Sequence, residues 1–154
     1  MGSQDESTSG ELSCVVALDL ARENLIIGAL IDDAGSIIDR DEQTLGGLTG
    51  EPAVQAVIDF TGQLLKRATR PVSAVGVGTP GIIDDTGTVR YATALQWRDV
   101  PLAARIQERF GLPTSVGNDI DVTTLAAVRF RDLPVRDLLL VSLDNSIGMG
   151  IMVG

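Results

Sequence analysis

The chain has 154 residues, 44% of them hydrophobic, which fits one domain with a single closed core. Its formal net charge is −9, from 21 acidic and 12 basic residues, and no run of Lys or Arg forms a phosphate-neutralising stripe, so we expect no direct nucleic-acid contact. The chain has no histidine and one cysteine, Cys14, which excludes a His-containing metal site, a Ser-His or Cys-His catalytic pair and an internal disulfide.

The N-terminal residues are polar and nearly free of apolar side chains. We expect residues 1–12 to be a disordered leader or linker and residues 13–154 to form the folded part. The longest apolar run, at residues 138–143, is far too short to span a membrane, and the N-terminus carries no signal region. These features predict a cytoplasmic protein without a membrane partner.

Three closely spaced apolar segments follow the leader. They are bounded by polar or Gly-containing turns and predict an antiparallel meander of strands at residues 14–20, 25–31 and 36–40. Pro52 then stands in the first turn of a segment in which apolar residues recur at three- and four-residue spacing. This spacing is typical of an amphipathic helix, which we expect to cover one face of the sheet.

The second half of the sequence alternates strands and helices. The predicted elements are strands at 72–77, 114–116 and 138–143, a hairpin at 82–89 turning at 85–87, helices at 101–110 and 119–131, and a last strand from residue 147. Gly111 would end the first of these helices, because a left-handed residue can stand there. The segment 138–143 is apolar on both faces, which is typical of a central strand covered on both sides. The order of the elements predicts an α/β fold, one lobe of the ribonuclease-H-like, actin-like type, with a mixed sheet and flanking helices.

An Asn-Asp pair stands at the junction of a short strand and a helix. Open α/β sheets place ligand-binding groups at such junctions. Asn118 or Asp119 could simply cap the helix, because its first backbone N–H groups have no partner within it. Alternatively, both side chains point into a cleft, where the carboxylate accepts hydrogen bonds from the hydroxyl groups of a ligand and the amide both donates and accepts. The spacing alone favours neither interpretation.

A second loop, Gly78-Thr79-Pro80-Gly81, ends the strand at 72–77. By itself it is a common Pro-Gly turn. Its position upstream of Asn118 and Asp119, with Ala92-Thr93-Ala94-Leu95-Gln96-Trp97 between them, is more specific. Together these segments resemble the ROK family of bacterial sugar kinases and sugar-responsive repressors, and residues 13–154 resemble the N-terminal lobe of such a protein.

The resemblance to ROK proteins implies roles for these residues. Asn118 and Asp119 would contact a sugar, and in a kinase Asp119 would take the proton from the attacking hydroxyl. The 78–81 loop would lie along the sugar, because missing side chains let the backbone come close. In the family the middle segment usually reads Ala-Pro-Asn-Leu before Trp, and its Asn helps to hold the sugar. Here Ala94 takes that place, so one amide contact is absent, and we interpret Trp97 as a packing residue rather than a sugar platform.

Two phosphate loops of the family's kinases survive only as remnants. The first, Asp-x-Gly-Gly-Thr, is replaced by Asp19-Leu20-Ala21-Arg22-Glu23-Asn24, which lacks both glycines and the threonine and adds the charge of Glu23. The second, Gly-Thr-Gly-Ile-Gly-Ala-Gly, keeps Gly148 and Gly150. We favour a turn at Asn145 and Ser146 that leads into a strand with a bulge at Gly148 over phosphate binding there.

The resemblance and its departures predict a sugar-sensing effector lobe of a ROK-type transcriptional regulator, which binds a sugar or sugar phosphate without turnover. No catalytic residue, cofactor or metal is then expected in this chain, and a homo-oligomer is possible. The alternative is a fragment of an ATP-dependent glucokinase-like kinase, with Asp119 as base and ATP and Mg as cofactors. A third reading is an interaction domain that has lost ligand binding. The family's zinc-bearing second lobe would follow Gly154, and a repressor's winged helix-turn-helix would precede Met1.

Overall fold

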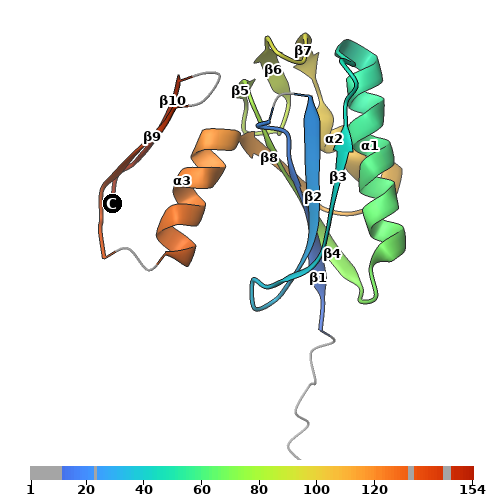
Figure 1. Ribbon diagram of the computed structural model, residues 1–154, viewed down its shortest axis with the longest axis horizontal. Coiled ribbons are helices and arrows are strands. Elements are labelled where there is room, and N and C mark those ends of the chain that lie inside the picture. Colours follow the sequence, from blue (N-terminus) through green and yellow to red (C-terminus); the bar gives the residue numbers. More distant parts are fainter. Residues whose placement is uncertain (1–11, 23, 132–133, 144–146) are drawn as a thin grey trace, which may run out of the picture.

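The computed structural model describes residues 12–22, 24–131, 134–143 and 147–154, and its centre is a mixed five-stranded sheet (Figure 1). The strand order is β3-β2-β1-β4-β8, where β1 pairs antiparallel with β2 and parallel with β4, and β4 pairs parallel with β8. The predicted antiparallel meander at the start of the chain is therefore confirmed. The five strands are β1 (Cys14–Asp19), β2 (Leu25–Asp32), β3 (Ile37–Thr44), β4 (Val72–Thr79) and β8 (Thr114–Asn118).

Two helices, α1 (Gly50–Arg67) and α2 (Leu102–Phe110), lie on one side of this sheet (Figure 1). Gly28 on β2 lets α1 approach closely, because an added Cβ there would stand 2.4 Å from Leu64 and 2.7 Å from Phe60. Pro52 lies in the first turn of α1, as predicted. Gly111 ends α2 with a φ of +69°, which also confirms the sequence prediction.

A small three-stranded sheet forms the segment between β4 and α2. It contains β5 (Ile82–Ile83), β6 (Val89–Ala92) and β7 (Trp97–Val100), in that order, and the pairing of β5 with β6 confirms the predicted hairpin. Trp97 is 1% exposed, and its Nε1 donates to the carbonyl of Gly50 at 3.0 Å. The indole therefore ties the small sheet to the start of α1, and its interpretation as a packing residue is confirmed.

The last part of the chain departs from the predicted arrangement. Strand β9 (Leu138–Leu143) pairs with β10 (Ile147–Met152) in a separate two-stranded sheet, and helix α3 (Asp119–Phe130) packs on one face of it (Figure 1). The prediction of a central strand covered on both sides is wrong for 138–143. An apolar pattern on both faces shows that the side chains of a strand favour burial on both sides. The elements that would cover those faces come from other parts of the chain, and within the described residues only α3 covers a face of this hairpin.

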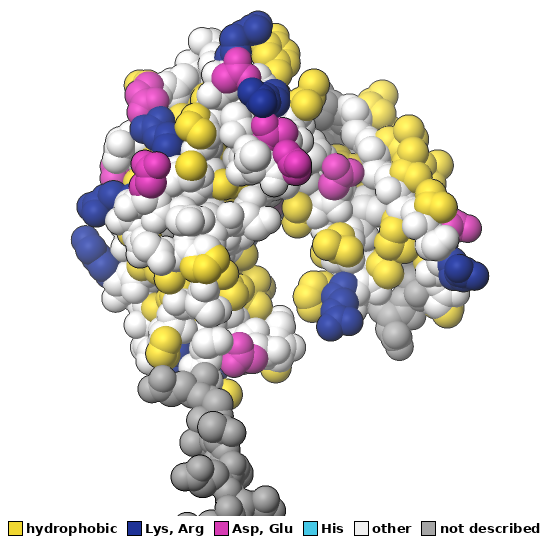
Figure 2. Space-filling view, turned by 180° about the vertical axis from the view of Figure 1, so that it is seen from behind, with side chains coloured by type: hydrophobic (Ala, Val, Ile, Leu, Met, Phe, Trp, Pro, Cys, Tyr) yellow, Lys and Arg dark blue, Asp and Glu magenta, His cyan; other side chains and the backbone are white. Residues whose placement is uncertain are grey.

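The outer face of this hairpin is apolar and open. It carries three cross-strand pairs, and Figure 2 shows hydrophobic side chains along this edge of the molecule. The exposed side chains of the face are Leu139, Val141, Leu143, Ile147, Met149 and Ile151. The β9–β10 register runs without a shift, so the predicted bulge at Gly148 is wrong and β10 is a regular strand.

No helix within the described residues is long and apolar enough to cross a membrane. The predicted leader at 1–12 falls, apart from Leu12, outside the described residues, as do Glu23, Asn145 and Ser146.

Candidate functional site

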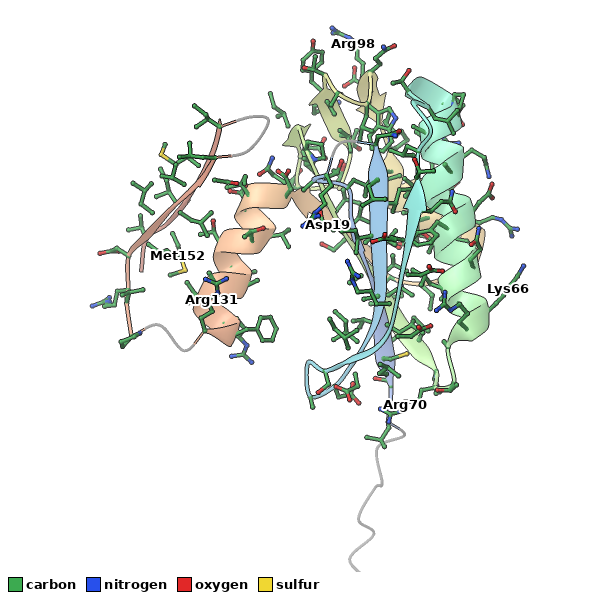
Figure 3. The ribbon with its side chains drawn as sticks, in the orientation of Figure 1. Asp19, Lys66, Arg70, Arg98, Arg131 and Met152 are labelled. Atoms are coloured by element: carbon green, nitrogen blue, oxygen red, sulfur yellow. The ribbon has the colours of Figure 1, made fainter. Side chains whose placement is uncertain are left out.

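The carboxyl ends of three parallel strands meet at one edge of the five-stranded sheet. In the registers of β1, β4 and β8, Asp19 is level with Gly78, Gly78 with Gly117, and Thr79 with Asn118. The backbone N–H of Leu20 donates to the carbonyl of Gly78 at 2.9 Å, which fixes the first two ends side by side. Asp19, labelled in Figure 3, lies at this edge. The fold thus brings together three of the segments singled out in the sequence, at the place where such sheets bind ligands.

The loop at residues 78–81 presents mainly its second half to solvent. Thr79 is fully buried and its hydroxyl donates to the carbonyl of Pro80 at 3.4 Å, whereas Pro80 and Gly81 are half-buried. Gly81 has a φ of +118°, and a Cβ added to it would stand 2.3 Å from the carbonyl oxygen of Tyr91. Glycine is therefore required where the loop crosses β6. In this conformation Pro80 and Gly81 are partly accessible, whereas the Thr79 side chain is not.

Asn118 is the N-cap of α3. Its Oδ1 accepts hydrogen bonds from the backbone N–H groups of Ile120 at 3.0 Å and Asp121 at 3.3 Å, with extended backbone angles of −63° and 136°. The capping interpretation of this residue is therefore confirmed. Its Nδ2 donates to the carbonyl of Gly81 at 2.9 Å, a contact across 37 positions of sequence that the local pattern gave no means of predicting.

Asp119 is the first residue of α3 and is half-buried. One of its carboxylate oxygens accepts from the backbone N–H of Ile120 at 2.9 Å. Within the described part of the chain, its other oxygen accepts no hydrogen bond and no Lys or Arg forms an ion pair with it. Asp119 thus retains an acceptor with which it could bind a hydroxyl group.

The segment between β6 and β7 forms a turn beside the 78–81 loop. The backbone N–H of Gln96 donates to the carbonyl of Thr93 at 3.1 Å, and the carbonyl of Leu95 accepts from Gly50 at 2.8 Å. Thr93 and Ala94 are exposed at the tip of this turn. The Ala94 methyl can make no hydrogen bond there, so any polar contact in this region falls to Thr93 or to the backbone.

The turn after β1 is closed by its own side chains. Oδ1 of Asp19 accepts from the backbone N–H of Ala21 at 2.8 Å, and Oδ1 of Asn24 accepts from that of Gly47 at 2.6 Å. Asn24 has a φ of +61°, in the left-handed region. The Asn24 contact ties the turn to the loop before α1. The consecutive glycine N–H groups from which a phosphate cradle is built are absent from the sequence of this turn.

Gly148 and Gly150 lie where β10 packs on α3. A Cβ at Gly148 would stand 2.6 Å from Cγ1 of Ile120, and one at Gly150 would stand 1.9 Å from Oγ1 of Thr124. Close helix–strand packing therefore accounts for both glycines without a phosphate. This supports the interpretation of the segment as a packed strand.

Two pockets among the described residues lie away from the strand ends. One, of about 410 Å³, opens between α1 and α2 and is lined by Ile58, Asp59, Gly62, Leu65, Lys66, Arg109 and Phe110. The other lies between α3 and β10. The candidate site at the strand ends is therefore defined by its polar groups and not by either pocket. Within the described residues, no group of three or more Asp, Glu, Cys or His side chains is placed to hold a metal ion.

Comparison with known proteins identifies both regulators and kinases as relatives. A xylose repressor of Caldicellulosiruptor bescii is 27% identical over 149 residues, which cover 93% of this chain and 37% of the repressor. A glucokinase of Halalkalibacterium halodurans is 28% identical over 130 residues, which cover 80% of this chain and 39% of the kinase. A solved ROK family glucokinase of Streptomyces griseus, in complex with glucose and AMPPNP, superposes with a TM-score of 0.80 at 27% identity, covering 92% of this chain and 45% of that one.

The ROK family model matches residues 15–154, and the chain belongs to the ROK family. The actin-like ATPase fold predicted from the order of elements is confirmed by the mixed sheet and by the structural neighbours. The chain spans less than half of the length of each of the three relatives.

Proposed function

We propose that this chain is the sugar-sensing lobe of a ROK-type transcriptional regulator, binding a sugar or sugar phosphate without turning it over. Sugar hydroxyls would be held by Asp119 and by the backbone of Pro80 and Gly81, with Asn118 beside them. The similarity to a xylose repressor supports this assignment, since that relative is named for a sugar response. In such a regulator, ligand binding would shift the balance between two conformations of the whole protein and thereby alter its DNA affinity.

The proposal that this chain does not turn over its ligand rests on the turn after β1. The contacts of Asp19 and Asn24 close this turn with side chains, and no Gly-Gly-Thr sequence offers backbone N–H groups to nucleotide phosphates. The sequence of this turn also adds Glu23, whose negative charge would repel a phosphate unless a metal ion stood between them. Phosphoryl transfer depends on positioning and on stabilisation of charge, so the loss of this cradle argues against a kinase.

The second candidate function is an ATP-dependent hexose kinase, with ATP and Mg as cofactors. Its support is the similarity to two glucokinases at identities close to that of the repressor. Asp119, with one free carboxylate oxygen among the described residues, would then be the base that takes the proton of the attacking hydroxyl. A domain that has lost ligand binding is a third candidate, supported by Ala94 in place of an amide side chain.

The ligand that we propose is a small sugar. We further propose that the protein is cytoplasmic and forms a homo-oligomer. Direct contact of this chain with DNA is not part of it, because the net charge of −9 opposes association with phosphates.

The test of the proposed function is an assay of ADP release coupled to sugar phosphorylation. With glucose, xylose and N-acetyl amino sugars as substrates, we expect no turnover above background, and no change with Asp119→Asn. Turnover that Asp119→Asn abolishes would contradict the regulator assignment and establish the kinase.

A further inference from the structure

The side chain of Asn118 joins two segments that the sequence keeps far apart. Its Oδ1 accepts from the N–H groups of Ile120 and Asp121 in the first turn of α3, and its Nδ2 donates to the carbonyl of Gly81. One amide group therefore fixes both the start of the helix and the end of the 78–81 loop. The three distances, 3.0, 3.3 and 2.9 Å, lie within or close to the ordinary range for N–H donors.

We infer that Asn118 is a positioning residue that locks the 78–81 loop to the first turn of α3, so that Gly81 and Asp119 form a single preorganised wall. The link is direct, because Asp119 follows Asn118 in the chain and opens the helix that Asn118 caps. The effect of the lock on sugar binding rests on the proposed function. The lock itself does not, because it acts in the ligand-free protein.

Asparagine suits this position because both halves of its amide are used. A cap requires an acceptor, which Asp, Ser or Thr would also supply, but the carbonyl of Gly81 requires a donor at the same time. Ionised Asp has no donor and would face the carbonyl oxygen with a negative charge. Ser carries its single hydroxyl on a shorter side chain, which would cap α3 but not also reach Gly81.

The hydrogen-bonding capacity left on Asn118 limits what it can do to a ligand. An amide oxygen has two acceptor sites and both are occupied, whereas the nitrogen has two N–H groups and one is used. Asn118 is therefore left with one N–H and no acceptor. It acts on a bound sugar chiefly through the loop and through Asp119, and a direct contact would be limited to a single donated bond.

The lock also explains how the loop keeps its shape beside solvent. Gly81 adopts a φ of +118°, which only glycine tolerates well, and such a residue has many alternative conformations when it is free. A hydrogen bond to its carbonyl selects one of them. Without that bond, part of the binding free energy would be spent on ordering the loop.

The test compares Asn118→Asp and Asn118→Ser with the parent chain by NMR, first without ligand. Both variants keep a cap for α3 and lose the bond to Gly81. We expect the carbonyl carbon of Gly81 and the amide nitrogen of Ile82 to shift and the N–H order parameters of Gly81 and Ile82 to fall. The amides of Ile120 and Asp121 should keep their helical shifts. Gln107→Glu, an exposed position on α2, is the control for the added charge of the Asp variant.

The second arm is a titration with xylose, glucose and N-acetylglucosamine. Loss of one neutral hydrogen bond raises the dissociation constant about threefold to tenfold, and we expect an increase in this range for both variants. Unchanged loop signals in both variants would overturn the lock, as would weakened binding without any change at the loop. If the loop signals change as expected but the parent chain binds no sugar, the lock stands and the proposed function fails.

Discussion

Gly150 lies directly against Thr124, so closely that an added Cβ would stand 1.9 Å from the threonine hydroxyl oxygen. Thr124 is buried, and its hydroxyl donates to the carbonyl of Ile120 at 2.7 Å, so moving the side chain would break this hydrogen bond. The contact places β10 on α3 with no intervening side chain. The glycine therefore serves packing between helix and strand.

Replacing Gly150 with Ala should destabilise the α3–β10 contact by about 1–3 kcal/mol, the usual cost of forcing a methyl group into a packed site. Gly76→Ala is the matched control, because a Cβ at Gly76 would meet nothing within 4 Å. Urea unfolding followed by circular dichroism measures both. Equal stability of the two variants would contradict this account of Gly150.

Trp97 should behave as a core residue. Trp97→Phe removes the hydrogen bond to the carbonyl of Gly50 and part of the buried surface, so we expect a loss of about 1–3 kcal/mol of stability. Trp97 is the single tryptophan of the chain, so its emission should be blue-shifted and resist quenching by acrylamide. Ready quenching that sugars prevent would instead indicate an exposed sugar platform.

Asp84 should contribute to the acid limb of the stability curve. The pKa of Asp84 is lowered chiefly by the hydroxyl of Thr86, with further contributions from the backbone N–H groups of Thr88 and Thr86 and from Arg90. Because the folded pKa lies below the unfolded value of about 3.9, the contribution is fully present above that value and disappears as pH falls through the folded pKa. Thermal melts of Asp84→Asn should therefore approach those of the parent chain at low pH.

The control for this comparison is Asp85→Asn, which changes an exposed neighbour in the same turn. We expect the difference in melting temperature between this variant and the parent chain to vary less with pH. A difference in melting temperature between Asp84→Asn and the parent chain that stays constant from neutral pH down to about pH 2 would contradict the role given to Asp84.

The outer face of the β9–β10 hairpin should bind hydrophobic dyes. Val141 and Met149 form its central cross-strand pair and are 53% and 58% exposed. Val141→Lys should reduce the fluorescence of an added naphthalene sulfonate dye, because a charge in the middle of an apolar patch disfavours dye contact. Ile37→Lys, at an exposed apolar position on β3, is the control and should change the signal less.

The elements predicted best from the sequence were those whose signals are local. The meander, the α1 helix, the 82–89 hairpin and the end of α2 at Gly111 each depend on nearby turn residues and on the spacing of apolar side chains, and the structure confirms them. The failure at 138–143 has a different origin. The residues of a strand indicate only that it can be buried, whereas its partner strands and covering helices come from other parts of the chain.

The candidate site was predicted only in part, because some of its contacts join residues that are far apart in the sequence. The Asn-Asp pair and the 78–81 loop were found from their positions at the ends of predicted strands, and parallel pairing brings those ends together. The bond from Asn118 to Gly81 and the burial of Thr79 depend on side-chain directions in the folded chain. No local pattern carries that information. The strand–helix junction and the resemblance to ROK proteins singled out Asn118, and only the structure revealed its contact with Gly81.

The most direct test of the account is a sugar titration of this chain followed by NMR chemical shifts. With xylose, glucose and N-acetyl amino sugars, the account predicts that the amide signals within residues 78–81, where Pro80 has no N–H, and within residues 117–121 shift before any others. Asp119→Asn should remove these shifts. Shifts that cluster at residues 19–24, or that appear only when a nucleotide is added, would contradict a sugar-sensing site at Asp119.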